Sequence, residues 1–472
     1  MEHTRWDRGL KVTGDGVGLA GHAGAVLLRQ LADRCGLTAG LGAVLARAGR
    51  FPLVDRGVAL VSMAIAIALG ATSMNDIAVL GHLEAVLGAA PSDTTARRTL
   101  ELADSGTLGK VAKARAKVRA HVWKLIAARP AGFPWLEVAG KTLTGWLVID
   151  MDATLITARS EKQGAAPTYK KGFGFHPLGA WLANTAECLA MLLRPGNAGS
   201  NTVTDHIKVL AAAITQIPAR FRSKLLVRVD GAGASHDLIT HLLSLATARR
   251  TVLFTCGWMI TPAEDAIKML PASAWQPGLD QDGTVQDDKH AAEITHLLSR
   301  ASAWPEGLRW IVRRTRPSRR QMPNLTVFEK ATGWRYSIPC TNTPASGVPG
   351  SHHAQFTDVL HREHAVVEDG VRAGKAMGLR NLPPKAWTMN CGWVLAANIA
   401  ADLAAWSRLL GLYGCHGLDD AEPDTLRYRI WHIPARLVRH ARQRVLKISP
   451  DWPWTDAFIT CWQRLCALPA PA

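Results

Sequence analysis

The chain has 472 residues, of which 48% are hydrophobic and 20% are charged. This length exceeds that of one ordinary domain, and the composition excludes a disordered or low-complexity chain. An excess of 55 Lys and Arg over 38 Asp and Glu gives a formal net charge of +17. That balance favours a polyanionic partner such as nucleic acid, and the alternative explanation is a composition that is simply rich in Ala and Arg.

Cysteine usage and hydropathy bear on the compartment. The eight cysteines form no C-x-x-C pair, so we expect reduced thiols and no zinc site. The most apolar run, at 58–69, is too short to span a bilayer. The first residues, MEHTRWDRGL, lack a signal-peptide pattern. Together these patterns predict a cytoplasmic protein.

Helical periodicity dominates residues 1–140, for which we predict a helical DNA-binding region. Within it, PSDTTARRTLELA predicts a helix that Asp93 caps and that projects Arg97 and Arg98 from its first turns. This helix and the preceding one resemble a helix-turn-helix, and a capped surface helix in a bundle is an equal alternative. A basic helix is predicted at 110–124, where it suits phosphate contacts or simple solvation.

From about residue 145 the pattern becomes mixed α/β, and 141–256 is predicted to be the first part of a core. Three strands are followed by a helix, a strand, a helix and a fifth strand, which is the ribonuclease H topology. Asp152 falls on the first strand and Asp230 at the end of the fourth. If those two strands are neighbours, their carboxylates meet.

Residues 257–345 interrupt this rhythm, and we predict an inserted β-rich subdomain there. Its short β-like runs are LRWIVRR, LTVFEK and RYSIPCT. Arginines interleave with tryptophans, a pattern that suits single-stranded or distorted DNA but also describes ordinary core tryptophans. Helices resume after the insertion, so 346–415 is predicted to be the second part of the core. Residues 416–472 form a basic C-terminal region.

A third acidic residue lies on a predicted helix in HREHAVVEDGVRAGKAMGL. At about 100° per residue, one stripe about 80° wide holds two histidines, one carboxylate and two cations: His361, His364, Glu368, Arg372 and Lys375. Glu363 and Asp369 fall outside that stripe. A cationic face around Glu368 favours phosphate binding beside a metal ligand. The alternative is a surface helix in which Glu368 and Arg372 are a stabilising pair.

These strings resemble the DDE transposases of bacterial insertion sequences, in particular the group named insertion sequence thirteen-eighty. The resemblance rests on IDMDATLITARSEKQGAAPTYKKGFGFHPL, LRPGNAGSNT, VRVDGAGAS and HREHAVVEDGVRAGKAMGLRNLP, and it covers nearly the whole chain. It implies a ribonuclease H-like core with a β-rich insertion between the second Asp and the Glu. It also implies cleavage at transposon ends followed by strand transfer into target DNA.

The resemblance implies a site and its partners. Asp152, Asp230 and Glu368 would be the catalytic residues and would bind two Mg²⁺ ions, with Mn²⁺ as a possible substitute. The DNA-binding residues would be His361, His364, Arg372, Lys375, Arg97 and Arg98. The partners would be the terminal inverted repeats and target DNA in the nucleoid, bound by a homodimer in the active complex.

Two positions leave alternatives open. Asp150 lies on the same face of its strand as Asp152, and Asp152 is preferred because the family pattern Asp-x-Ser/Thr is met by Asp152-Ala153-Thr154. The wider, related insertion-sequence-four-like transposases carry Tyr and Arg where this chain has His361 and His364. Those residues are associated with phosphate contacts at a DNA hairpin, so the resemblance does not decide whether a hairpin intermediate forms. The alternative functions are an inactive transposase-derived DNA-binding protein and a nuclease on the same fold.

Overall fold

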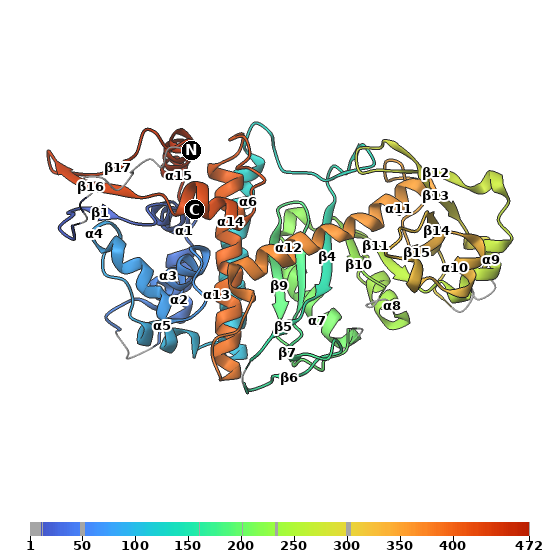
Figure 1. The fold of residues 1–472 in the computed structure, drawn as a ribbon, viewed down its shortest axis with the longest axis horizontal. Coiled ribbons are helices and arrows are strands. Elements are labelled where there is room, and N and C mark those ends of the chain that lie inside the picture. Colours follow the sequence, from blue (N-terminus) through green and yellow to red (C-terminus); the bar gives the residue numbers. More distant parts are fainter. Residues whose placement is uncertain are drawn as a thin grey trace, which may run out of the picture.

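The structure is a computed structural model that describes residues 11, 13–47, 52–159, 161–200, 202–231, 235–298 and 304–471. Its elements spread along the longest axis of the molecule (Figure 1). A helical part lies at one end and a large sheet occupies the centre. Strands β12 (Gln276–Leu279) to β15 (Arg335–Thr341), which form one side of that sheet, lie at the other end. None of the helices in the described ranges is long and apolar enough to cross a membrane.

One mixed sheet of nine strands runs in the order β12-β13-β14-β15-β11-β10-β4-β8-β9. The strands that form its central part are β4 (Leu147–Ala153), β8 (Leu178–Leu182), β9 (Glu187–Leu192), β10 (Lys224–Val229) and β11 (Thr251–Trp258). Strands β4, β10 and β11 are parallel, β8 pairs antiparallel with β4, and β9 pairs antiparallel with β8. The predicted strand β4 and the predicted strand β10 are therefore neighbours.

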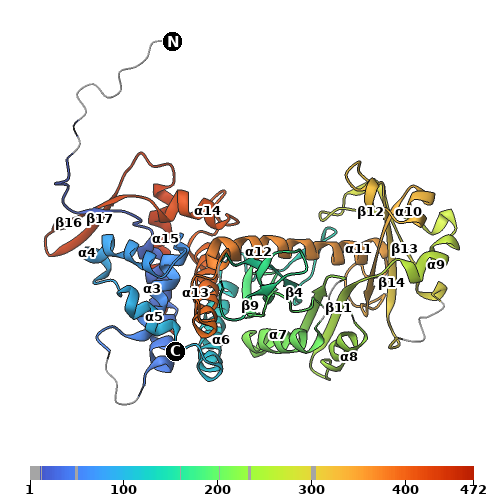
Figure 2. The same ribbon diagram turned by 60° about the horizontal axis from the view of Figure 1, so that its bottom comes forward.

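Helices cover both faces of this sheet (Figure 2). Helices α7 (Val203–Gln216) and α8 (His236–Ser244) pack on one face, and α11 (Ala354–Arg362) and α12 (Val367–Gly374) cross the other. Strands β4, β10 and β11 are nearly continuous apolar runs, as expected for parallel strands buried on both sides. A small three-stranded sheet follows β4 and consists of β5 (Ile156–Thr157), β6 (Ala166–Pro167) and β7 (Phe173–Phe175).

The segment 257–345 extends the central sheet. Its strands are β12 (Gln276–Leu279), β13 (Val285–Glu293), β14 (Arg309–Thr315) and β15 (Arg335–Thr341), with α9 (Glu264–Lys268) and α10 (Val327–Thr332) beside them. Strand β15 pairs antiparallel with β11, so the four strands add to its open edge. The run LTVFEK is a helix and not the expected strand, because Thr326 and Glu329 form a capping box that starts α10.

The arginines and tryptophans of this segment contact one another. The Arg314 guanidinium lies 4.2 Å from the ring centroid of Trp275 and 4.6 Å from that of Trp334. Trp310 is only 2% exposed and meets the Trp258 ring edge-on. Packing and cation–π contacts within the protein thus occupy the faces of these tryptophan rings. This arrangement favours the alternative that they are core residues and do not stack on DNA bases.

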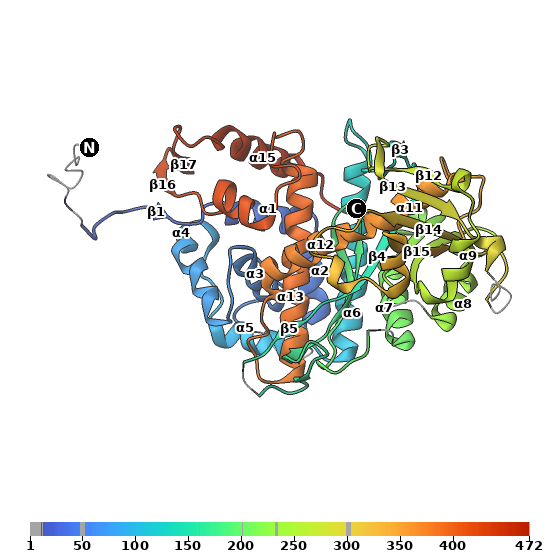
Figure 3. The ribbon, with the colours of Figure 1, turned by 45° about the vertical axis from the view of Figure 1, so that its right-hand side comes forward.

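The helical part combines both ends of the chain (Figure 3). Its N-terminal helices are α1 (Ala25–Arg34), α2 (Leu37–Leu45), α3 (Arg56–Ala68), α4 (Glu84–Leu87), α5 (Asp93–Leu100) and α6 (Ser105–Ala127). Later elements pack on them: α13 (Trp387–Trp406), α14 (Pro423–Leu426) and α15 (Thr455–Ala467). A three-stranded sheet joins β1 (Leu19–Ala20) to β16 (Ala435–His440) and β17 (Gln443–Ile448). The short pair β2 (Glu137–Val138) and β3 (Lys141–Thr142) leads into the large sheet.

A buried ionic cluster ties the helical part to the large sheet. Arg119 of α6 is fully buried, with Nε 2.7 Å from Glu187 Oε1 and Nη2 2.9 Å from Asp402 Oδ1. Arg115 also pairs with Asp402, at 2.7 Å. The indole of Trp406 donates to Glu187. Because these groups come from α6, β9 and α13, their mutual neutralisation requires all three elements in place.

Candidate active site

The register of β4 and β10 brings two carboxylates to one edge of the sheet. The last pair in that parallel ladder is Met151 with Val229, so the next residues along each strand are Asp152 and Asp230. Neighbouring strands lie about 4.8 Å apart, so both side chains leave the sheet side by side at its carboxyl edge. Asp152 is half-buried and Asp230 is exposed.

The third carboxylate comes from the helix that crosses β4. Glu368 lies in the first turn of α12, which packs against β4. Its side chain is exposed, and within the described ranges no cation forms an ion pair with it. Burial raises the pKa of the Asp152 carboxyl, and the charges of Asp230 and Glu368 raise it further, against the Ala153 amide, which donates to it at 2.7 Å. The three acids therefore share one electrostatic site.

Asp150, the competitor of Asp152, has a different environment. It is 1% exposed, and its two oxygens accept from Nε and Nη2 of Arg228 at 2.7 and 2.8 Å. His364 Nδ1 lies 3.0 Å from Asp150 Oδ1. Burial acts to raise the pKa of Asp150, but Arg228 and His364 outweigh it and hold that pKa below its usual value. Both Asp150 oxygens are thus committed inside the protein.

The two histidines of the Glu368 helix also face the sheet. His361 Nδ1 lies 3.2 Å from the Thr255 hydroxyl on β11. Burial, with His364 and Arg228 nearby, lowers the pKa of His361 to about 3, so this ring is neutral at pH 7. His364 is buried beside Asp150. The structure gives both rings partners within the protein, and their contact with DNA phosphate stays a prediction.

The helix is less regular than the stripe of side chains predicts. A 3₁₀ turn, Glu363–Val366, separates α11 from α12, and each of its residues turns about 120° instead of about 100°. Glu363, which the stripe excluded, is the first residue of this turn and is buried, 3.7 Å from Arg228 Nη1. Burial raises the pKa of Glu363 to about 7.

The two predicted cations, Arg372 and Lys375, lie further along the helix that carries Glu368. Arg372 is exposed and pairs with Asp369 and, at 3.3 Å, with Glu422, so the alternative pair with Glu368 is not formed. Lys375 is half-buried at the end of α12. The sequence predicts that Arg372 and Lys375 share the helix of Glu368, as they do. It does not predict that Arg372 pairs with Asp369 and Glu422.

Arg97 and Arg98 lie on α5 in the helical part, far along the molecule from β4 (Figure 1). Both are exposed, and Arg97 pairs with Glu101 at 3.1 Å. The cap of this helix is Ser92, whose hydroxyl accepts from the Thr95 amide, and not the predicted Asp93. The reason is that the Ser92 backbone is extended, which is the conformation that an N-cap adopts.

The metal-binding capacity of the site follows from its donors. No group of three or more His, Cys, Asp or Glu in the described part of the chain is arranged closely enough to enclose an ion. The donors nevertheless fit Mg²⁺, because all three are carboxylates and hard cations prefer oxygen ligands. A bound cation would also relieve the repulsion that raises the pKa of Asp152.

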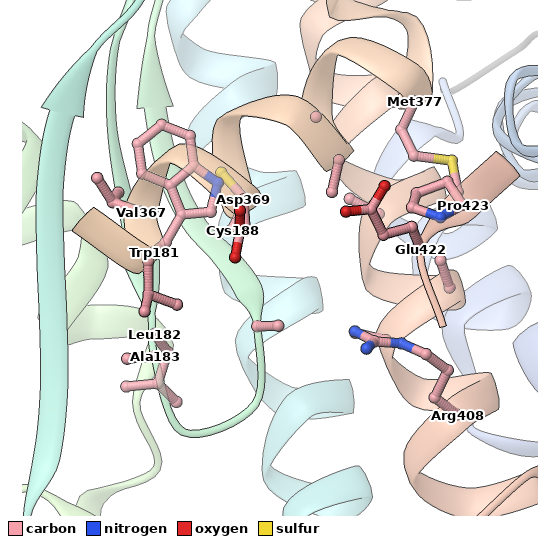
Figure 4. A pocket seen from close by; sticks show the side chains of 18 of the residues that line it. Trp181, Leu182, Ala183, Cys188, Val367, Asp369, Met377, Arg408, Glu422 and Pro423 are labelled. Carbon is pink, nitrogen blue, oxygen red and sulfur yellow. The ribbon is translucent and has the colours of Figure 1, made fainter. Parts of the chain in front are cut away.

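A separate cavity of about 200 Å³ is lined in part by residues of α12 (Figure 4). Trp181, Cys188 and Val367 lie on one side of it, and Arg408 and Glu422 lie on the other. Its lining contains none of the three carboxylates. This cavity therefore neighbours the candidate site without forming part of it.

Comparison with known proteins identifies the family. The family model described as "Transposase DDE domain group 1" matches residues 3–470. The chain belongs to this transposase family. No curated protein matches it. Among solved structures, this transposase is similar to a chain from "Cryo-EM structure of piggyBac transposase synaptic complex with hairpin DNA (SNHP)", with 12% identity and a TM-score of 0.40. That match covers 91% of this chain and 81% of the other.

Sequence reasoning singled out Asp150 and His364 but missed Arg228 and the contacts that join these three residues beneath the carboxylates of this transposase. Asp150 lies two residues before Asp152, Arg228 lies two before Asp230, and His364 lies four before Glu368. Two residues along a strand and four along a helix return to the same face. The signal was present in the spacing, but only the parallel register shows that Asp150 and Arg228 are direct partners.

Proposed function

We propose that this protein is a DNA transposase that cuts the ends of a mobile element and joins them to target DNA. The observation that supports the proposal is that Asp152 and Asp230 follow paired positions of β4 and β10, and that the charges of Asp230 and Glu368 both act on Asp152. Family membership supports the reaction class, and the net charge of +17 supports a polyanionic substrate. The quoted sequence strings support assignment to the insertion sequence thirteen-eighty group.

We infer that the centre of the sheet is a ribonuclease H-like core. The order β9-β8-β4-β10-β11 supports this inference, because the first three strands form a meander and the last two follow by α/β crossovers. Segment 257–345 would be the insertion, 141–256 and 346–415 the two parts of the core, and 1–140 and 416–472 the flanking regions.

In this proposal the three carboxylates hold two divalent cations, Mg²⁺ or Mn²⁺. When bound, such ions supply an activated oxygen nucleophile and stabilise the leaving oxygen of a phosphodiester. Water cuts the strand and leaves a 3′-hydroxyl. That hydroxyl then attacks a target phosphodiester, so one P–O bond forms as another breaks. No side chain forms a covalent bond with DNA, and the chain's task is to hold the strands in line.

The remaining predicted residues would bind DNA. Arg97 and Arg98 are exposed on α5, and Arg372 is exposed on α12, so each is available to phosphate. Lys375 would contact phosphate beside the carboxylates, and contacts by His361 and His364 would require both rings to leave their present partners. Because two ends must be cut, the active complex would be a homodimer.

Replacing each acid by its amide tests the catalytic assignment. Asp152→Asn, Asp230→Asn and Glu368→Gln should retain binding to end-containing DNA and lose Mg²⁺-dependent nicking by about 10³-fold or more, since metal ligation is worth several kcal/mol. Gel-shift and nicking assays on the same DNA measure both.

Asp369→Asn is the matched control, because Asp369 is an exposed acid on the same helix and pairs with Arg372. This control should nick at the wild-type rate. Full nicking by any of the three amide variants would remove that residue from the site. A protein that nicks ends without joining them to target DNA would be a nuclease, and one that binds without nicking would be an inactive derivative.

A further inference from the structure

The C-terminal ribbon, defined as β16, β17 and the turn between them, projects from the helical end of the molecule. It lies at the edge of the molecule in two views (Figures 1 and 2). Its base is anchored by pairing with β1 and by the hydrogen bond from the Leu437 amide to the Gly18 carbonyl. The outer part of the ribbon carries exposed side chains on both strands.

The charge of the ribbon is uniformly positive. Its sequence, ARLVRHARQRVLKI, contains no Asp or Glu. Its exposed cations are Arg436, Arg439, Arg442, Arg444 and Lys447. Arg444 reaches the Ala85 carbonyl near the end of α4 at 3.2 Å. Within the described ranges, none of the five forms an ion pair with a carboxylate, so the described residues do not neutralise this surface.

The register sets like charges directly opposite each other. Arg436 pairs with Lys447 across the strands, and Arg439 pairs with Arg444. Such pairs oppose formation of a ribbon because their charges repel at close range. The turn adds strain, because Ala441 and Arg442 have φ of 46° and 64°, a conformation that Gly and Asn adopt more easily. The cation pairs and the strained turn destabilise the ribbon. Binding of an anionic ligand would offset this repulsion, so the ribbon is suited to such a ligand.

We propose that the C-terminal ribbon binds the phosphate backbone of duplex DNA, away from the three carboxylates. This inference rests on the proposed function for the identity of the polyanion. A two-stranded ribbon has the width that the major groove admits, and its cations on both faces and at the turn can then reach phosphates on either side. Because the ribbon and the carboxylates lie at separate places along the molecule, this contact lengthens the DNA footprint (Figure 1).

The salt dependence of binding tests this contact. Removing three ribbon cations with Arg436→Gln, Arg439→Gln and Arg442→Gln should reduce the slope of log K against log salt concentration by about 3, close to one per phosphate contact. Fluorescence anisotropy with a duplex that contains one transposon end, measured across a salt series, gives the slope. The effect should also appear with unrelated duplexes, because phosphate contacts carry no base sequence.

The charge-matched control is Arg220→Gln, Lys224→Gln and Arg249→Gln. These exposed cations lie at the amino ends of β10 and β11, the sheet edge opposite the carboxylates. Control and wild type should have the same slope. Equal slopes for the ribbon triple variant and the control triple variant would overturn the inference, whether or not the protein cuts DNA.

Arg442→Asn guards against loss of folding as the explanation. Asn accepts the left-handed turn more readily than Arg, so this variant should melt at the same or a higher temperature while its salt slope falls by about 1. An unchanged slope in the folded variant would exclude the turn from the contact. Failure of the wild type to nick DNA would count against the proposed function and leave the ribbon test intact.

Discussion

Asp150 and Asp152 are two aspartates on one strand whose pKa values shift in opposite directions. Asp150 is buried against Arg228 and His364, which hold it ionised. Asp152 is half-buried among Asp230 and Glu368, which oppose its charge. A buried ion pair stabilises a site only while both partners are present. A repelled carboxylate is instead poised to accept a cation, and this difference supports Asp152 as the proposed ligand.

Substitution at these two positions should therefore separate stability from chemistry. Asp150→Asn should lower the free energy of unfolding by about 3–5 kcal/mol, because it leaves Arg228 buried without its carboxylate. Asp152→Asn should leave the free energy of unfolding unchanged or slightly raised, because it removes a repelled charge. Urea denaturation measures both. Equal destabilisation by the two variants would contradict this division of roles.

At the scale of elements, the carboxylates depend on how the Glu368 helix is held against the sheet. His361, near the end of α11, lies beside Thr255, and His364, in the 3₁₀ turn that follows, lies beside Asp150. These two contacts fix the helix over β11 and β4. Glu368 lies one turn beyond His364, so its position over Asp152 follows from that attachment.

His364→Ala should loosen this attachment without unfolding the protein. We expect the Mg²⁺ concentration for half-maximal nicking to rise about 10–100-fold, the usual effect of losing a residue that orients a ligand. Calorimetric titration of Mg²⁺ into the free protein should show the same loss. Asp369→Asn, an exposed residue of the same helix that pairs with Arg372, is the control. Unchanged Mg²⁺ affinity in His364→Ala would show that Glu368 is held by other contacts.

At the scale of the whole molecule, the helical part and the sheet behave as one structure because charged groups from both are buried together. Arg119, Glu187 and Asp402 come from three elements, and Arg119 bridges the two acids. Removing Arg119 would leave both carboxylates buried without this cation. The helical part would then lose the contact that orients it against β9.

Arg119→Met should lower the free energy of unfolding by about 3–5 kcal/mol, although Met fills much of the same volume. Lys117→Met changes an exposed cation on the same helix and should change stability by less than about 0.5 kcal/mol. Denaturation followed by tryptophan fluorescence measures both, since Trp123 and Trp406 donate to Glu187. Similar values for the two variants would show that the cluster does not join the parts.

Much of the fold was predictable because its signals are local. Apolar runs that end in Asp152 and Asp230, and the order of strands and helices between them, follow from hydrophobic periodicity, and the structure has them in that order. Other expectations were wrong for local reasons, since a capping box made LTVFEK a helix and Ser92 capped α5. The stripe on the Glu368 helix assumed one uniform rotation, which the 3₁₀ turn interrupts.

By itself, the sequence determined the secondary structure around the site and the presence of three acids at suitable positions. Only the tertiary structure decided which groups neutralise one another. Asp150 and Asp152 are equivalent in a strand pattern, and it is the register with β10 that gives Asp150 an arginine partner and leaves Asp152 beside Asp230. Register depends on contacts between residues far apart in the chain, and neither propensity nor periodicity within one segment encodes those contacts.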